Sequence, residues 1–225
     1  MNYIIYHRKR DISDIGNCRI YHDSYYQGNQ DPYIWNTQFL HSFCHITQIQ
    51  PEIGSKIFWV SSGDKYPDFN SLNCDCVFVV EEKKHWKNTN SISIDDPIVD
   101  NNEQAFNHHY CWYHQHPLKK RKRYTLKANK EQSFQPQDKN QNLIDIVPLL
   151  TNNGLLIDDL RKAISKTRNG KRAVNSRTFK LSNELADKLY EYLLSADIKI
   201  KGEMIMDKHP YKQNKIEIHN KKCRC

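Results

Sequence analysis

The sequence predicts an α/β fold: a mostly parallel sheet flanked by helices, with a basic, mainly helical C-terminal extension. The first observation behind this prediction is the order of elements in the N-terminal half, where apolar runs and a segment of helical spacing read as strand, helix, strand, connection, strand. The second is the run CDCVFVVEE at 74–82, in which four apolar residues are contiguous. Such strands are typical of sheets that are covered on both faces.

The elements of the first part follow from local patterns. Aromatic and β-branched residues predict a strand over 17–26, and Gly, Asn and Pro predict a loop over 27–33. Apolar residues at helical spacing predict a helix over 34–49 that ends before PEIGS. The apolar run KIFWVSS predicts a buried strand over 56–62.

The middle of the chain is more polar. Residues 87–102 are read as a polar connection, and residues 103–115 as a segment able to form a helix before Pro117. KRYTLKA predicts a further strand. Residues 129–142 hold few apolar side chains, which predicts a long surface loop.

The C-terminal part is predicted to be mainly helical. Apolar residues recur at helical spacing over 155–168 and again over 183–196, where Ser182 would cap the second helix. We place a boundary near residue 140. Residues 1–140 would then be an α/β catalytic domain, and 141–225 a basic region packed on it.

The composition predicts a folded cytoplasmic protein. No apolar run reaches the ~18 residues that a membrane helix needs, and the apolar segment in MNYIIYHRKRD is too short for a secretory signal. In a reducing compartment we expect the seven cysteines to be mostly free thiols.

Charge is distributed unevenly. Residues 1–118 hold 9 Lys/Arg against 14 Asp/Glu, a net of −5, whereas residues 119–225 hold 25 against 12, a net of +13; the two sum to the +8 of the chain. A strongly basic half indicates a polyanionic partner, and we expect DNA, with RNA the less favoured choice. A solvated lysine-rich surface is the alternative. The block Lys119, Lys120, Arg121, Lys122 and Arg123 is the densest expected phosphate contact.

Four histidines and Cys111 cluster immediately before this block, within HHYCWYHQH. Cys111 and His114 have a C-x-x-H spacing, and CDC and CRC form C-x-C pairs, but no second short-spaced pair completes a zinc pattern. We therefore predict no bound metal and no cofactor. A nucleophilic pair of Cys111 and His114 is a weaker possibility, and no P-loop, G-x-G-x-x-G or G-x-S-x-G motif is present.

A metal-dependent nuclease is a competing interpretation. Glu81 and Lys83 form an E-x-K on the predicted strand 74–82, and Asp64 or Asp68 could supply the upstream carboxylate. Such an enzyme would need a divalent cation. A non-catalytic nucleic-acid-binding module is the second alternative.

The leading interpretation joins two distant segments. GNQDPY at 28–33 follows the first predicted strand, and HQHPL at 114–118 lies in a later loop. At the carboxyl edge of a parallel sheet, a carboxylate and a histidine from these loops could face each other across a ligand.

These two segments resemble motifs of the uracil-DNA glycosylase superfamily. The resemblance implies that Asp31 activates water, that Tyr33 packs against a flipped base and that His116 stabilises the departing base, with Leu118 as a wedge in the DNA. Trp35 could also stack on the base, although core packing explains it equally well. The base-reading asparagine of the family is not found, so we expect a modified base, for example in phage DNA, rather than uracil. The implied reaction is hydrolysis of the N-glycosidic bond after base flipping.

Overall fold

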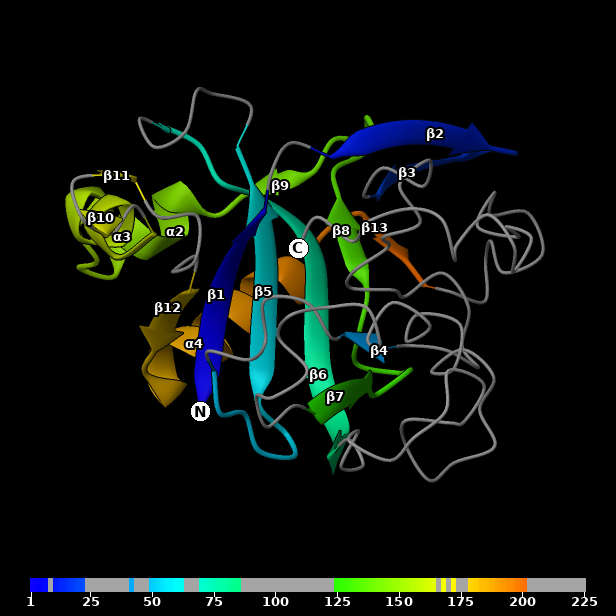
Figure 1. Ribbon diagram of the computed structural model, residues 1–225. Coiled ribbons are helices and arrows are strands. Elements are labelled where there is room, and N and C mark those ends of the chain that lie inside the picture. Colours follow the sequence, from blue (N-terminus) through cyan, green and yellow to red (C-terminus); the bar gives the residue numbers. More distant parts are fainter. Residues whose placement is uncertain are drawn as a thin grey trace.

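The chain is built around a seven-stranded mixed sheet, seen face-on in Figure 1. The computed structural model describes residues 1–7, 10–22, 41–42, 49–62, 69–85, 124–164, 167–168, 171–172 and 178–201. Within these residues the strand order is β12-β1-β5-β6-β7-β4, and β9 pairs with β6. The strands of this sheet are β1 (Asn2–His7), β4 (His41–Ser42), β5 (Lys56–Ser61), β6 (Asn73–His85), β7 (Tyr124–Ala128), β9 (Ile144–Asp145) and β12 (Thr178–Leu181).

The predicted parallel sheet is wrong. Only β1 and β5 run parallel among the paired strands of the described part, whereas β12–β1, β5–β6, β6–β7, β7–β4 and β6–β9 are antiparallel. The contiguous apolar run in β6 did indicate burial on both faces. Burial does not determine strand direction, however, because an antiparallel sheet that is covered by two layers needs the same apolar strands.

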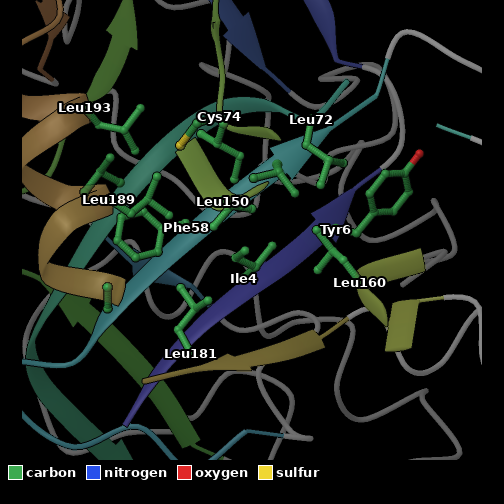
Figure 2. Close-up of a cluster of buried hydrophobic side chains, with 14 of the residues drawn as sticks. Ile4, Tyr6, Phe58, Leu72, Cys74, Leu150, Leu160, Leu181, Leu189 and Leu193 are labelled. Carbon is green, nitrogen blue, oxygen red and sulfur yellow. The ribbon is translucent and has the colours of Figure 1, made fainter. Parts of the chain in front are cut away.

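Helices cover one face of the sheet. They are α2 (Val147–Asn152), α3 (Ile157–Ile164) and α4 (Asn183–Leu194). Figure 2 shows their buried side chains, among them Leu150, Leu160 and Leu189, packed against Ile4 of β1 and Phe58 of β5. This cluster is the larger part of the hydrophobic core.

Two small sheets contribute to the opposite face of the main sheet. One small sheet is the hairpin of β2 (Asp11–Ile15) and β3 (Cys18–His22), and the other pairs β8 (Gln135–Gln137) with β13 (Ile198–Ile200). Ile20 of the hairpin and Ile200 of β13 pack with Trp59 and Phe78 of the sheet. A further pair of two-residue strands, β10 (Thr167–Arg168) and β11 (Lys171–Arg172), lies between α3 and β12 in the chain.

Several local predictions are confirmed. β5, β6 and β7 lie where apolar runs predicted strands, and α3 and α4 lie within the two predicted helices. Ser182 caps α4, since its side chain accepts a hydrogen bond from the Leu185 N–H at 3.2 Å. The apolar residues Ala186, Leu189 and Leu193 share the buried side of α4.

Other local predictions are wrong. The strand predicted over 17–26 exists as β3, but it belongs to the β2–β3 hairpin rather than to the main sheet. Within the predicted helix 34–49, His41–Ser42 form strand β4, because pairing with β7 overrides the local apolar spacing. The predicted surface loop 129–142 contains β8, whose three residues are buried. No helix in the part of the chain that can be described is long and apolar enough to cross a bilayer.

Candidate functional site

The parallel pair gives the sheet one edge at which two strands end together. β1 ends at His7 and β5 ends at Ser61. Proteins with parallel strands commonly bind ligands at such an edge, so it is the first place to look for a site. Buried polar residues gather here: Arg10 follows β1, and Ser61 and Ser62 end β5.

A bulge in β6 adds a carboxylate to this edge. The register of β6 against β5 shifts between Trp59 and Val60, and Asp75 is the extra residue. Its Oδ2 accepts a hydrogen bond from Nε of Arg10, and the side chains of Arg10 and Asp75 are 5% and 2% exposed. Both charged side chains are buried, so each must be compensated by the other. Removing one partner would leave an uncompensated charge in the core.

One glutamine connects the bulge to the hairpin. Nε2 of Gln135 in β8 donates to the backbone carbonyl of Asp75 at 2.7 Å and to that of Tyr21 at 2.9 Å. Oε1 of Gln135 accepts from the N–H of Tyr21 at 3.0 Å. A single buried amide therefore joins β6, β8 and β3.

A histidine and a serine of the hairpin are in contact beside this network. Nε2 of His22 lies 2.7 Å from Oγ of Ser13. A contact of this kind occurs in nucleophile–base pairs. His22 is only 2% exposed, however. The contact therefore satisfies a buried imidazole and does not present a base to a substrate.

Within the described residues, this edge is a buried polar core. Arg10, His22, Asp75 and Gln135 are all classed with the buried residues. They hold the hairpin against the sheet by paired charges and satisfied amides. We assign them a positioning role.

Sequence reasoning missed most of this network. The available signal was Asp75, a carboxylate inside the apolar run CDCVFVV, because an acid in a buried strand must be paired. Arg10, His22 and Gln135 carried no local signal. Arg10 meets Asp75 across 65 positions of sequence, and Gln135 meets Tyr21 across 114.

The residues predicted for a glycosylase site lie outside the described residues. They are Asp31, Tyr33, Trp35, His116, Leu118, Lys119, Lys120, Arg121, Lys122 and Arg123. The geometric premise that joined Asp31 to His116 was the carboxyl edge of a parallel sheet that includes the strand before Asp31. That strand is β3 of the separate hairpin, so the premise does not hold.

The nuclease residues on β6 occupy its far end. Glu81 is exposed, and Lys83 is half-buried. Nζ of Lys83 lies 3.5 Å from the carbonyl of Pro51 and 4.2 Å from the centre of the Tyr124 ring. These contacts account for Lys83 without a metal or a phosphate.

The carboxylates proposed to complete that nuclease, Asp64 or Asp68, lie outside the described residues. The nuclease interpretation therefore stays a prediction.

The thiols of the CDC sequence cannot act as a chelating pair. Cys74 belongs to the hydrophobic cluster under the helices, whereas Cys76 belongs to the cluster on the opposite face. Burial, followed by the nearby charge of Asp75, holds the pKa of the Cys74 thiol well above its ordinary value. Cys74 is thus a buried thiol of low reactivity. Within the described ranges, no group of three or more His, Cys, Asp or Glu side chains is placed to hold a metal ion.

No family model, no curated protein and no solved structure matches this chain. Its function must therefore be argued from its own charges and contacts.

A strongly basic stretch of the sequence runs from α3 to β12. Between Asp159 and Glu184 the chain holds eight cations and no carboxylate: Arg161, Lys162, Lys166, Arg168, Lys171, Arg172, Arg177 and Lys180. We call residues 161–180 the basic segment. α3 contacts β12, and β12 is an outermost strand of the sheet. Figure 1 shows α3, β10 and β11 grouped beyond that side of the sheet.

A short hairpin forms the centre of the basic segment. In the pairing of β10 with β11, Arg168 lies opposite Lys171, and Thr167 lies opposite Arg172. Two residues, Asn-Gly, connect the strands in the chain, and this dipeptide is the one that two-residue hairpin connections prefer. Three of these four paired residues are cations in the sequence.

Not every cation of the segment is available to a ligand. Nε and Nη2 of Arg161 donate to the carbonyl of Phe69 at 2.9 and 2.6 Å, and Nη2 also contacts Oδ1 of Asn70 at 2.7 Å. Arg161 therefore anchors the chain before β6. Lys180 is exposed.

Proposed function

We propose that the protein binds nucleic acid, with duplex DNA as the expected partner, through the basic segment. The observation that carries this proposal is the run of eight cations without a carboxylate in the sequence, which leads into the edge strand β12. A phosphate backbone is the polyanion that such a run fits, because Lys and Arg displace its condensed counterions on binding. This partner agrees with the cytoplasmic location expected from the sequence.

Carboxylates are absent from the sequence of most of this segment. Lys56 pairs with Asp187 at 2.8 Å, and Lys188 pairs with Glu184 at 2.8 Å; such pairs neutralise a surface locally. The first two cations of the basic segment are paired in the same way, Arg161 with Asp158 at 3.0 Å and Lys162 with Asp159 at 3.9 Å. From Lys166 to Lys180 the sequence holds six cations and no carboxylate. This part of the segment carries the proposal.

Catalysis remains a prediction from the motifs. The buried pair of Arg10 and Asp75 positions the hairpin. The E-x-K of Glu81 and Lys83 awaits a test, because its expected partner carboxylates lie outside the described residues. The glycosylase prediction, centred on Asp31 and His116, likewise concerns residues outside the described part.

The test is a binding assay with a matched control. We expect the wild-type protein to bind labelled duplex DNA, and a variant with Arg168, Lys171 and Arg172 changed to Ala to bind at least about tenfold more weakly. A control variant with Lys130, Lys139 and Lys201 changed to Ala loses the same charge from another part of the surface and should bind nearly as wild type. If both variants bound DNA equally weakly, the loss of affinity would come from the change in net charge rather than from the basic segment. Measuring the affinity for duplex RNA under the same conditions shows whether DNA or RNA is the preferred partner.

A further inference from the structure

The inner edge of the β2–β3 hairpin is closed by glutamine side chains. Gln137 donates from Nε2 to the carbonyl of Arg19 at 2.7 Å, and the N–H of Arg19 donates to Oε1 of Gln141 at 2.8 Å. Gln135 does the same for both backbone groups of Tyr21. The backbone N–H and C=O groups of Arg19 and Tyr21 that point away from β2 are thus all hydrogen-bonded to side chains. Another strand could not pair with β3 at these two residues.

Among the described strands, none pairs with the outer edge of the hairpin. Ile12 is paired with Tyr21, and Asp14 is paired with Arg19. In an antiparallel pair, when the N–H and C=O of one residue point away from the partner strand, those of the residue opposite do so as well. The backbone groups of Ile12 and Asp14 therefore point outward, and β2 has no strand beside it other than β3 within the described residues.

The side chains along this edge are acidic and apolar. Asp11 and Asp14 are exposed, and Ile12 is 53% exposed. Arg19 of β3 pairs with Asp14 at 3.2 Å, so Asp11 carries the acidic character of this edge. β2 contains no cation, although the chain as a whole carries a net charge of +8. We propose that the outer edge of β2 binds an extended, basic peptide segment of a partner protein by adding it as a strand.

Three features define that partner. Its backbone would exchange hydrogen bonds with the N–H and C=O of Ile12 and Asp14, which is how strand addition provides affinity. A lysine or arginine would lie near Asp11, and an apolar residue would cover Ile12, because cross-strand neighbours interact in this way. A segment in which cations and β-branched residues alternate meets these requirements.

Other occupants fit this edge less well. Nucleic acid would be repelled by Asp11, so this surface is distinct from the one proposed to bind DNA. A second copy of the chain, paired through its own β2, would bring the Asp11 of both copies to one interface, and like charges across strands are destabilising. The peptide proposal is independent of the nucleic-acid proposal.

The experiment measures binding of a fluorescein-labelled peptide in which lysine alternates with valine. A second peptide of the same charge has proline at the alternate positions and cannot pair as a strand. We expect the first peptide to bind and the second to bind at least about tenfold more weakly. Hydrogen exchange should slow at the amides of Ile12 and Asp14 when the first peptide is added, and should not slow at those amides with the second.

Two variants locate the site. Ile12→Pro removes one outward-facing N–H at an edge position where proline is tolerated, and Asp11→Lys reverses one charge without removing a backbone group. Both should weaken binding of the lysine–valine peptide, and the two-peptide comparison on the wild-type protein stands even if Ile12→Pro does not fold. The proposal is overturned if the wild-type protein does not bind the peptide, if the proline peptide binds equally, or if folded variants bind as wild type.

Discussion

Arg10 and Asp75 form a buried ion pair between the start of the β2–β3 hairpin and the bulge of β6. Arg10 stands directly before β2, so the pair determines where the hairpin leaves the sheet. Asp75 is the residue that the bulge adds to β6. A bulge that reaims one side chain in this way is a conserved kind of structural device in sheets, and here it supplies the counter-charge for an arginine in the core.

Removing Asp75 should therefore destabilise the protein strongly. We expect Asp75→Ala to lower the free energy of unfolding by about 3–5 kcal/mol, because Arg10 would remain buried without its counter-charge. The double variant Arg10→Met/Asp75→Leu should recover much of that loss. Chemical denaturation followed by circular dichroism measures both. The exposed pair of Arg19 and Asp14, 3.2 Å apart, is the control, and Asp14→Ala should cost no more than about 1 kcal/mol. Equal costs for Asp75→Ala and Asp14→Ala would contradict this account.

Gln135 should control the docking of the hairpin. Gln135→Ala leaves the N–H and C=O of Tyr21 and the carbonyl of Asp75 without their amide partner, at a cost of about 1–3 kcal/mol for each group that stays buried. We expect faster hydrogen exchange across β2 and β3 and little change in α4. Gln132, which is exposed on the same segment, provides the control, since Gln132→Ala should leave exchange unchanged. Uniform acceleration throughout the protein would indicate global destabilisation instead of local undocking.

Tyr124 should make stability fall in alkali. Burial, followed by the nearby Tyr3, raises the pKa of the Tyr124 hydroxyl well above its ordinary value of 10.0, and this hydroxyl donates to the carbonyl of Ile49. The folded state holds the proton more tightly than the unfolded state. The resulting stabilisation is complete below about pH 10 and is lost as the pH rises above it. Urea unfolding on both sides of pH 10 should show a steeper decline for wild type than for Tyr124→Phe. Parallel declines would contradict the assignment.

The motif-based enzyme prediction has its own test. If the resemblance of GNQDPY and HQHPL reflects function, Asp31→Asn and His116→Ala should fold normally and lose about 10²-fold or more of base-excision rate, equivalent to about 2.7 kcal/mol of barrier. Alkali-sensitive strand breakage on modified and unmodified duplexes measures that rate. A wild-type protein that forms no abasic sites on any of these substrates would rule out the glycosylase assignment and leave the binding function.

Local structure could be predicted where neighbours in sequence determine it. The apolar runs of β5 and β6 and the capped, amphipathic α4 depend on residues within a few positions of each other. Strand direction could not be predicted, because β5 and β6 would be equally apolar in a parallel sheet. β8 could not be predicted either, since a strand with buried glutamines makes sense only once Gln135 and Gln137 are seen bonding to β3.

The same limit applies to the site. The basic half was visible in the composition, and the structure adds that part of it is attached to the β12 edge. The pairing of Arg10 with Asp75 could not be predicted, because no local sequence pattern around either residue points to the other. Long-range contacts thus decide which polar residues are structural, and they could not be read from the sequence.

Salt dependence of DNA binding tests the central claim most directly. A phosphate contact contributes about 0.9 to the slope of log affinity against log salt concentration. The variant with Arg168, Lys171 and Arg172 changed to Ala should therefore have a shallower slope than wild type by up to about 2.7, while the control variant at Lys130, Lys139 and Lys201 keeps the wild-type slope. Identical affinity and slope in wild type and the Arg168/Lys171/Arg172 variant would contradict the account.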